Sequence, residues 1–142
     1  MPPCRFAMAL ALAASLSPLV ACGGADKSGG AATTAGKAAP AEIDAAGLKA
    51  RMDAGKIALI DVRTPSEFAD GHAPGAVNIP LDQLAQRMSE LEAHKTGELY
   101  LICRSGARSG RAQGQLAAAG FTNPINVAGG TLAWRAAGFP VE

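Results

Sequence analysis

Residues 99–109 read LYLICRSGARS, and this stretch decides the fold. The apolar run over 99–102 predicts a short strand that is buried on both faces of a sheet. Cys103 follows directly, and a loop of small residues around Gly106 leads into a helix predicted over 109–119, with Ala112, Leu116 and Ala119 as its apolar face. The backbone N–H groups of such a loop converge on one point and form a nest for an anion. The cysteine therefore lies at the carboxyl end of a strand, where open α/β sheets place their ligand sites.

Short apolar runs and helical patterns alternate over the rest of the chain from residue 42 onward. Further strands are predicted over 57–62, 76–79 and 124–127, and further helical segments over 44–54 and 132–135. Short buried strands separated by helices imply a mostly parallel sheet that is covered on both faces. The sequence therefore predicts an α/β fold.

Two more helical patterns contain local detail. Thr64 is the expected N-cap of a helix, with Pro65 at its first position and Glu67 three residues after the cap. A second pattern has apolar residues at spacings of 3, 4 and 3, which predicts one face of another helix. Its members are Leu81, Leu84, Met88 and Leu91.

The composition excludes several classes of function. The chain has 142 residues, enough for one domain and a targeting or linker segment. Its 13 Lys and Arg residues nearly balance 12 Asp and Glu residues, so it lacks the basic field of a nucleic-acid-binding protein. Three Cys and two His residues are too few and too scattered for a disulfide framework or a tetrahedral zinc site. We therefore expect no metal, no cofactor and no nucleic-acid partner.

The N-terminus is typical of an exported protein. Residues 1–21 contain one charged residue, Arg5, and then an uncharged run over 6–20 that is shorter than the roughly 20 residues of a membrane span. This is the pattern of a signal peptide. The sequence LVAC, which ends at Cys22, resembles the bacterial lipobox, in which the cysteine becomes lipidated. The alternative is an ordinary signal peptide cut nearby, which leaves Cys22 as a free thiol.

The segment after the signal peptide predicts a tether. Residues 23–41 contain no Val, Ile, Leu, Met or aromatic residue, so they cannot form a packed core. We therefore expect a lipidated Cys22 with a flexible tether over 22–41, and a folded domain over 42–142. Gly23 follows Cys22 where lipoproteins retained at the inner membrane often have Asp. The resemblance to lipoproteins thus favours the outer membrane, with the domain facing the periplasm and the lipid as its membrane contact.

One cysteine remains in the predicted domain. Cys4 leaves with the signal peptide and Cys22 lies in the tether, so Cys103 has no disulfide partner. In an oxidising compartment such a lone thiol is either inert in the core or reactive. A helix N-terminus lowers a thiol pKa by about one unit, since it contributes up to ~2 kcal/mol and one unit is about 1.36 kcal/mol. Converging N–H donors and the flanking Arg104 and Arg108 lower it further, and we expect a thiolate at neutral pH.

These residues resemble the rhodanese family of sulfurtransferases, and the resemblance extends over residues 42–142. The sequence DVR at 61–63, followed by EFADGHAPGAVNIP at 67–80, is similar to the family's first signature. The sequence CRSGARS at 103–109 is similar to its active-site loop. Gly129-Gly130 with Trp134 is similar to its closing segment, and Trp134 is expected to pack in the core.

The resemblance implies a rhodanese-like fold and the transfer of a sulfane sulfur. Cys103 would take the outer sulfur of an anionic donor such as thiosulfate, hold it as a persulfide, and pass it to cyanide or a thiol. No base is needed for a thiolate, and His94 is expected to be solvated. Asp61, Arg63 and His72 are expected to support the fold near the site. The expected donor-binding residues are Arg104, Ser105, Gly106, Ala107, Arg108 and Ser109.

Three other functions stay open on the sequence. The first is the activity of a cysteine phosphatase or an arsenate reductase of similar fold. Cysteine phosphatases have five residues between Cys and Arg, whereas four residues separate Cys103 from Arg108. A rhodanese-like module that binds without catalysis is the second. The third is a persulfide relay that hands sulfur to an accepting protein, which shares the Cys103 persulfide and differs in the acceptor.

Overall fold

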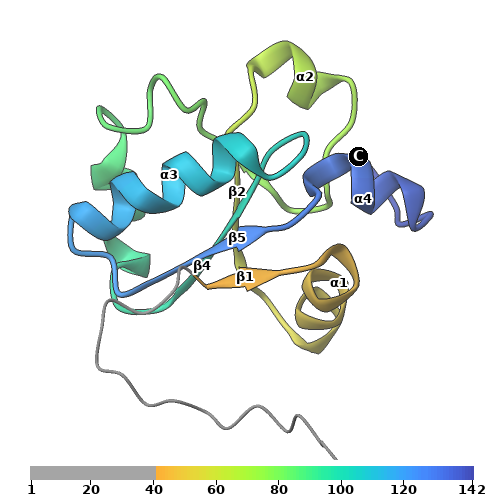
Figure 1. The fold of residues 1–142 in the computed structure, drawn as a ribbon, viewed down its shortest axis with the longest axis horizontal. Coiled ribbons are helices and arrows are strands. Elements are labelled where there is room, and N and C mark those ends of the chain that lie inside the picture. The colour runs from red at the N-terminus through yellow and green to blue at the C-terminus, as the bar shows by residue number, and fades with distance from the viewer. Residues whose placement is uncertain (1–40) are drawn as a thin grey trace, which may run out of the picture. The chain divides into compact units, whose positions relative to one another are not determined.

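The computed structural model describes residues 41–142, which form a five-stranded parallel sheet with helices on both faces (Figure 1). The strand order is β1–β5–β4–β2–β3, and every neighbouring pair is parallel. The predicted α/β fold is therefore confirmed, and edge strand β1 is an addition that the sequence did not predict. The strands are β1 (Glu42–Ile43), β2 (Ala58–Asp61), β3 (Val77–Asn78), β4 (Glu98–Ile102) and β5 (Asn123–Val127).

Two of the helices, α1 and α2, begin with a side-chain cap. In α1 (Ala45–Ala54), the Asp44 side chain accepts a hydrogen bond from the Gly47 N–H at 2.7 Å. In α2 (Pro65–Ala69), Thr64 and Glu67 form the predicted reciprocal capping box, which satisfies N–H groups that a helix start leaves free. The remaining helices are the 3-10 helix η1 (Met88–His94), α3 (Ala107–Ala118) and α4 (Gly130–Ala136).

The helix predicted from the apolar spacing over 81–91 is wrong in type. Residues 81–87 form successive turns and η1 follows, with three-residue hydrogen bonds such as Leu84 N–H to Leu81 O and Glu90 N–H to Arg87 O. Two of the three spacings are 3, which is also the period of a 3-10 helix. The predicted apolar face is nevertheless correct, because Leu84 and Leu91 are buried in the core.

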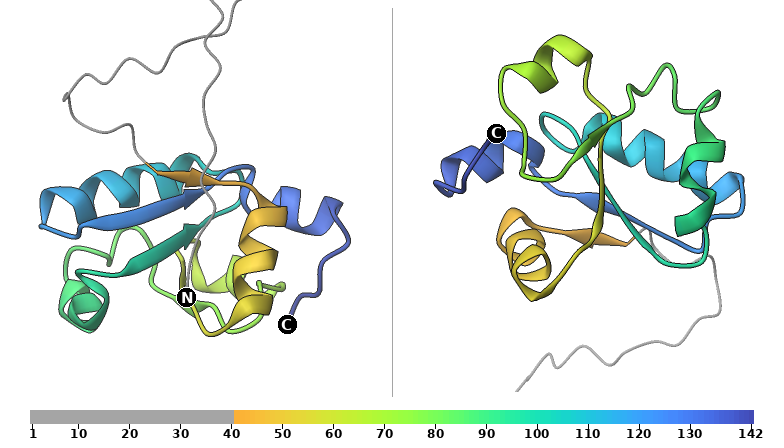
Figure 2. Two further views of the ribbon diagram at one scale, coloured as in Figure 1. Left: turned by 90° about the horizontal axis from the view of Figure 1, so that it is seen from below. Right: turned by 180° about the vertical axis from the view of Figure 1, so that it is seen from behind.

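Two apolar clusters cover the two faces of the sheet. One joins α3 and η1 to the sheet through Leu101, Leu116 and Leu91. The other joins α1 and α4 to the opposite face through Leu48 and Trp134. Figure 2 shows α1 and α4 together on one side, apart from α3. Because helices cover both faces, the carboxyl edge of the strands stays available for a site.

The predictions for the N-terminus fall outside the described residues. These are the signal peptide over 1–21, the lipidation of Cys22 and all of the tether except Ala41. Within residues 41–142, no helix combines the length and apolar character that a membrane span requires. The same residues contain no group of three or more His, Cys, Asp or Glu placed to hold a metal ion.

Candidate active site

Cys103 lies where β4 ends and the loop to α3 begins. The last four residues of the strand leading to it are buried, so the position of the sulfur is fixed by the core. Gly106 is the N-cap of α3 and has a φ of 98°, a left-handed conformation that side chains rarely adopt. That conformation turns the loop back over the sulfur. The predicted sequence of strand, tight loop and helix N-terminus is therefore the observed one.

Hydrogen-bond donors converge on the Cys103 sulfur. The Gly106 N–H donates to Sγ at 3.1 Å, and the Ser109 hydroxyl lies 3.3 Å from it. Burial, the largest influence, raises the thiol pKa, but hydrogen bonds from Ser109 and from the N–H groups of Ser105 and Gly106 outweigh it. The net effect is a Cys103 pKa below its ordinary value. Local hydrogen bonds therefore favour the thiolate.

The Cys103 sulfur is buried more deeply than a reactive thiol on an open loop would be. The residue is 1% exposed and packs with the apolar cluster beneath α3. A cavity of about 330 Å³ opens beside the loop, and its lining includes Arg104, Leu132 and Arg135 but not Cys103. A reactant in this cavity therefore has to reach down into the loop to touch the sulfur.

The N-terminus of α4 holds the loop from the other side. The Thr131 N–H donates to the Cys103 carbonyl at 2.8 Å, and the Leu132 N–H donates to the Arg104 carbonyl at 3.0 Å. Gly130 makes this approach feasible, because a Cβ there would lie 2.1 Å from the Cys103 carbonyl oxygen. These bonds turn the loop carbonyls away from the sulfur and leave the N–H groups to face it.

The two arginines of the loop differ in their partners. Arg108 donates two hydrogen bonds of 2.7 Å to the Glu67 carboxylate of α2. This pairing, chiefly through the hydrogen bonds from Arg108, lowers the Glu67 pKa to about 2. Arg104 is exposed and takes part in none of the ion pairs among the described residues. Arg104 is thus the free cation, whereas Arg108 has to share its charge, and the donor-binding role of both stays a prediction.

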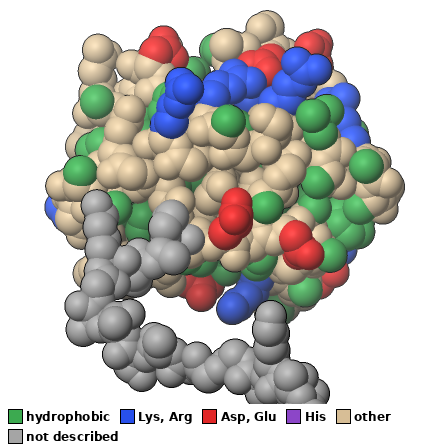
Figure 3. All heavy atoms as spheres, in the orientation of Figure 1, with side chains coloured by type: hydrophobic (Ala, Val, Ile, Leu, Met, Phe, Trp, Pro, Cys, Tyr) green, Lys and Arg blue, Asp and Glu red, His purple; other side chains and the backbone are tan. Residues whose placement is uncertain are grey.

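Glu67 is the site residue that sequence reasoning missed. The capping pattern identified it as part of a helix start, but its second partner lies 41 residues away, and no local pattern indicates that contact. Figure 3 shows Lys and Arg side chains in a band along the edge where Figure 1 places α2, with acidic side chains among them. Basic side chains therefore predominate at the carboxyl edge, and the Glu67 carboxylate offsets part of their positive charge.

Asp61, the last residue of β2, and Arg63 form a buried ion pair. The Arg63 Nη2 lies 2.6 Å from Asp61 Oδ2, and both side chains are at most 5% exposed. Arg63 also donates to the Gly71 carbonyl at 3.0 Å, which ties the segment after α2 to the end of β2. Breaking one partner of such a pair costs about 3–5 kcal/mol. The expected buried contact between Asp61 and Arg63 is present, and its role in supporting the site stays a prediction.

Comparison with known proteins agrees with this arrangement. Residues 44–137 match the family described as Rhodanese-like domain. The chain belongs to the rhodanese-like family. It is 39% identical over 101 residues to a protein of Allochromatium vinosum named sulfurtransferase. The matched region covers 70% of this chain and 92% of the relative. It is 38% identical over 93 residues to thiosulfate sulfurtransferase 16, chloroplastic, of Arabidopsis thaliana, covering 58% and 78%.

A solved structure supports the same family. The rhodanese-like domain protein of Staphylococcus aureus has a TM-score of 0.61 and 34% identity, and the match covers 66% of this chain and 90% of that one. In our rhodanese-like domain, His72 stacks on Phe68, and its Nδ1 lies 3.1 Å from the Phe68 carbonyl. His94 is exposed on η1. Within residues 41–142, no hydrogen bond joins either histidine to Cys103.

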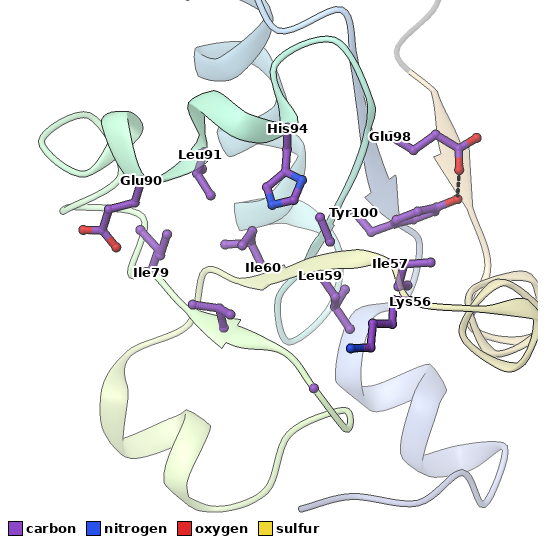
Figure 4. A pocket seen from close by; sticks show the side chains of 13 residues that line it. Lys56, Ile57, Leu59, Ile60, Ile79, Glu90, Leu91, His94, Glu98 and Tyr100 are labelled. Carbon is purple, nitrogen blue, oxygen red and sulfur yellow. Dashed lines mark hydrogen bonds between the residues drawn. The ribbon is translucent and has the colours of Figure 1, made fainter.

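A second, larger hollow lies at the other end of the rhodanese-like sheet. It has a volume of about 660 Å³ and runs along β2, β3 and the start of β4. Figure 4 shows Glu90, Leu91 and His94 of η1 on one side of it and Lys56 on another, with Tyr100 bonded to Glu98. None of the residues that line it belongs to the loop over 103–109. It is therefore separate from the cysteine site.

Proposed function

We propose that the protein is a sulfurtransferase that moves a sulfane sulfur from an anionic donor such as thiosulfate to a thiophilic acceptor through a persulfide on Cys103. The observation that carries the proposal is the convergence of donors on Cys103, with the Gly106 N–H 3.1 Å and the Ser109 hydroxyl 3.3 Å from Sγ. The relatives named as sulfurtransferases support the same activity.

The first half of the reaction forms the persulfide. The Cys103 thiolate attacks the outer sulfur of thiosulfate, a new S–S bond forms, and sulfite leaves with the electron pair of the broken S–S bond. The outer sulfur then carries the negative charge, and the N–H groups of the loop that faced the thiolate are placed to stabilise it. Arg104, free of any carboxylate, draws the dianionic donor to the cavity beside the loop.

The second half returns the enzyme to its starting state. The carbon of cyanide, or the sulfur of a thiolate, attacks the outer sulfur of the persulfide. The bond to Sγ breaks, and its electron pair stays on Cys103 as thiolate. Neither step requires a proton to be taken from a hydroxyl, which agrees with the lack of a histidine bonded to Cys103 among the described residues.

The burial of Cys103 supports sulfur transfer over phosphate hydrolysis. Cys103 is 1% exposed. The single projecting sulfur atom of a sulfane donor therefore reaches Sγ more readily than a tetrahedral phosphorus surrounded by oxygens. The loop also has four residues between Cys103 and Arg108, one fewer than in cysteine phosphatases. The nest is therefore suited in size to one sulfur atom.

A steady-state assay tests the proposal. The purified domain, given thiosulfate and cyanide, should form thiocyanate and sulfite, and Cys103→Ser should lose this activity because a hydroxyl is neither ionised nor a carrier of sulfane sulfur. A parallel assay with p-nitrophenyl phosphate should show no Cys103-dependent hydrolysis. Hydrolysis without thiocyanate would replace the proposal with a phosphatase. If the protein shows neither activity, it is a binding module. If thiols but not cyanide discharge the persulfide, it is a relay.

We also propose that the protein is exported and anchored by a lipid on Cys22, which holds the domain at the periplasmic side of the outer membrane. Support comes from the uncharged run over 6–20 and the lipobox-like LVAC sequence. In a bacterial host, full-length protein should incorporate labelled palmitate and move to the membrane fraction. Cys22→Ala should abolish both. Labelling that persists in Cys22→Ala would contradict the anchor.

A further inference from the structure

A line of hydrogen bonds leads from the protein surface to Cys103. Glu42 in β1 and Asn126 in β5 are register partners, and the Asn126 Nδ2 donates to Glu42 Oε1 at 3.0 Å. The Ser109 hydroxyl donates to Asn126 Oδ1 at 2.6 Å and lies 3.3 Å from Cys103 Sγ. Figure 1 shows β1 beside β5 with α3 across them. Two side chains, Asn126 of β5 and Ser109 of α3, thus connect Glu42 of β1 to the Cys103 sulfur.

Glu42 fixes the orientation of the Asn126 amide. An ionised carboxylate only accepts hydrogen bonds, so the NH₂ group of Asn126 has to face it. The amide oxygen then faces Ser109, where it can only accept. Asn126 is 9% exposed and Ser109 is fully buried, so water does not readily replace the bond between them. The direction of the Ser109–Asn126 bond is therefore set from the sheet edge.

The Ser109 hydroxyl has one proton and three acceptors nearby. Asn126 Oδ1 is the closest at 2.6 Å, followed by the Gly106 carbonyl at 3.1 Å and Cys103 Sγ at 3.3 Å. The Gly106 carbonyl already accepts the Gly110 N–H at 2.9 Å. The competition is therefore chiefly between Asn126 and Cys103. When the proton points to Asn126, the lone pairs of Ser109 face the sulfur and suit a thiol; when it points to the sulfur, it suits a thiolate.

We propose that Asn126, oriented by Glu42, is a positioning residue that draws the Ser109 proton away from Cys103 and so sets the balance between thiol and thiolate. On ionisation the Cys103 proton leaves to solvent, the Ser109 hydroxyl turns to the sulfur, and Asn126 Oδ1 gives up its bond. With Asn126 present, the thiol is therefore more acidic than an isolated cysteine, because the loop donors still act on it, but less acidic than Ser109 alone would make it. The inference rests on the proposed function only in taking Cys103 as the reacting group.

Other charged groups lie around the Cys103 loop, of which Arg108 interacts electrostatically with Cys103, and they have to stay constant in a test. They come from the loop, from α2 and α3, and from the end of β2, and none is part of the hydrogen-bonded line. These groups are Arg104, Arg108, Glu67, Asp61 and Arg63. Substitutions at 126 and 109 change no charge, so shifts in these variants report the hydrogen bonds.

The test is the pH dependence of Cys103 alkylation by iodoacetamide, a small reagent. Asn126→Leu keeps the branched shape but cannot accept a hydrogen bond from Ser109, so the inflection should move down by about 0.5–1 pH unit, the equivalent of one hydrogen bond. Ser109→Ala should move it up. In the double variant the Asn126 substitution should have no further effect, because it acts through Ser109. If Asn126 had only a structural role, the two single variants would not shift the inflection in opposite directions. The effect of the Asn126 substitution would also not vanish in the double variant.

A surface variant tests the same line if Asn126→Leu does not fold. In Glu42→Gln the new amide can donate to Asn126 Oδ1, which lets the Asn126 NH₂ face Ser109 and turns the hydroxyl proton to the sulfur. The inflection should move down. Asp44→Asn is the matched control, since it removes one negative charge nearby and keeps the N-cap of α1. The shift in Glu42→Gln should exceed that of the control.

The possible outcomes separate this inference from the proposed function. An unchanged or higher inflection in Asn126→Leu, or a shift of equal size in the Ser109→Ala background, would overturn the inference. Equal shifts in Glu42→Gln and Asp44→Asn would do the same. Alkylation requires no sulfur donor, so the predicted shifts in a protein that forms no thiocyanate would sustain the positioning role and refute sulfur transfer.

Discussion

The two ends of β4 differ in what they offer to a small molecule. At the carboxyl end, Cys103 is 1% exposed beneath a narrow loop, beside a cavity of about 330 Å³. At the amino end, Tyr100 and Glu98 border a hollow of about 660 Å³. The larger space has an apolar floor and paired polar groups, such as Tyr100 with Glu98 and Glu90 with Arg87. The loop beside the smaller one has donors that converge on the Cys103 sulfur.

If Cys103 is the reacting group, as proposed, its position follows the direction of backbone N–H groups rather than the size of a cavity. Parallel strands and the helices that follow them bring helix N-termini to the carboxyl edge, where their free N–H groups point at one place. The amino edge receives helix C-termini and loops instead. A nucleophile placed at the amino end would therefore lack the donors that favour its ionised form.

The largest effect is expected at Gly130, which lets α4 approach the loop. In Gly130→Ala the new Cβ would meet the Cys103 carbonyl oxygen at 2.1 Å, so the loop has to move and persulfide formation should be lost. The free energy of unfolding should fall by about 4 kcal/mol or more. Gly138→Ala is the control: it also has a positive φ but meets nothing within 4 Å, and should cost about 1 kcal/mol with activity retained. Equal losses in both would contradict the role of close packing.

A smaller effect is expected when the charge on Arg108 is released. Glu67→Gln keeps a capping residue for α2 but removes the carboxylate that shares the Arg108 charge. The KM for thiosulfate should fall about two- to five-fold, as a gain near 1 kcal/mol implies. Initial rates against thiosulfate concentration measure this. An unchanged KM would mean that Arg108 does not meet the donor.

The same variant has a pH signature in stability. The Glu67 pKa is lowered from 4.5 to about 2 in the folded protein, so the pair stabilises the fold above pH 4.5 and is lost as the pH falls towards 2. Wild type should therefore exceed Glu67→Gln in free energy of unfolding by about 1 kcal/mol at neutral pH, with the gap closing between pH 4.5 and 2. Urea unfolding of both proteins across this range measures the gap. A gap independent of pH would rule out the ion pair as its source.

The smallest effect on activity is expected in the amino-end hollow. Tyr100→Phe removes the hydrogen bond to Glu98, whose side chain is 43% exposed and can bind water instead, so the loss of stability should stay within about 1.5 kcal/mol. Because neither Tyr100 nor His94 contacts the loop, Tyr100→Phe and His94→Ala should both keep the wild-type kcat/KM for thiosulfate. A tenfold fall in kcat/KM in either variant would mean that the hollow at the amino end of β4 influences the Cys103 site, and would contradict the separation of the two.

The sequence predicted the features of the site that are local in the chain. Apolar runs located the buried strands, and the order strand, loop, helix placed Cys103 at the carboxyl edge. The contacts that tune the site are long-range: Glu67 with Arg108 spans 41 residues, and Glu42 with Asn126 spans 84. Strand β1, which brings Glu42 to Asn126, is two residues long and has no periodicity to reveal it. Such contacts depend on packing, which spacing along one chain does not encode.

The most direct test of the account is the mass of the domain after thiosulfate treatment. Intact-protein mass spectrometry should show one added sulfur atom, and fragmentation should place it on Cys103. Cyanide should remove it, and Cys103→Ser should gain none. If the folded protein keeps its original mass although Cys103 is reduced, persulfide formation on Cys103 is contradicted. Added sulfur on any other residue would contradict it as well.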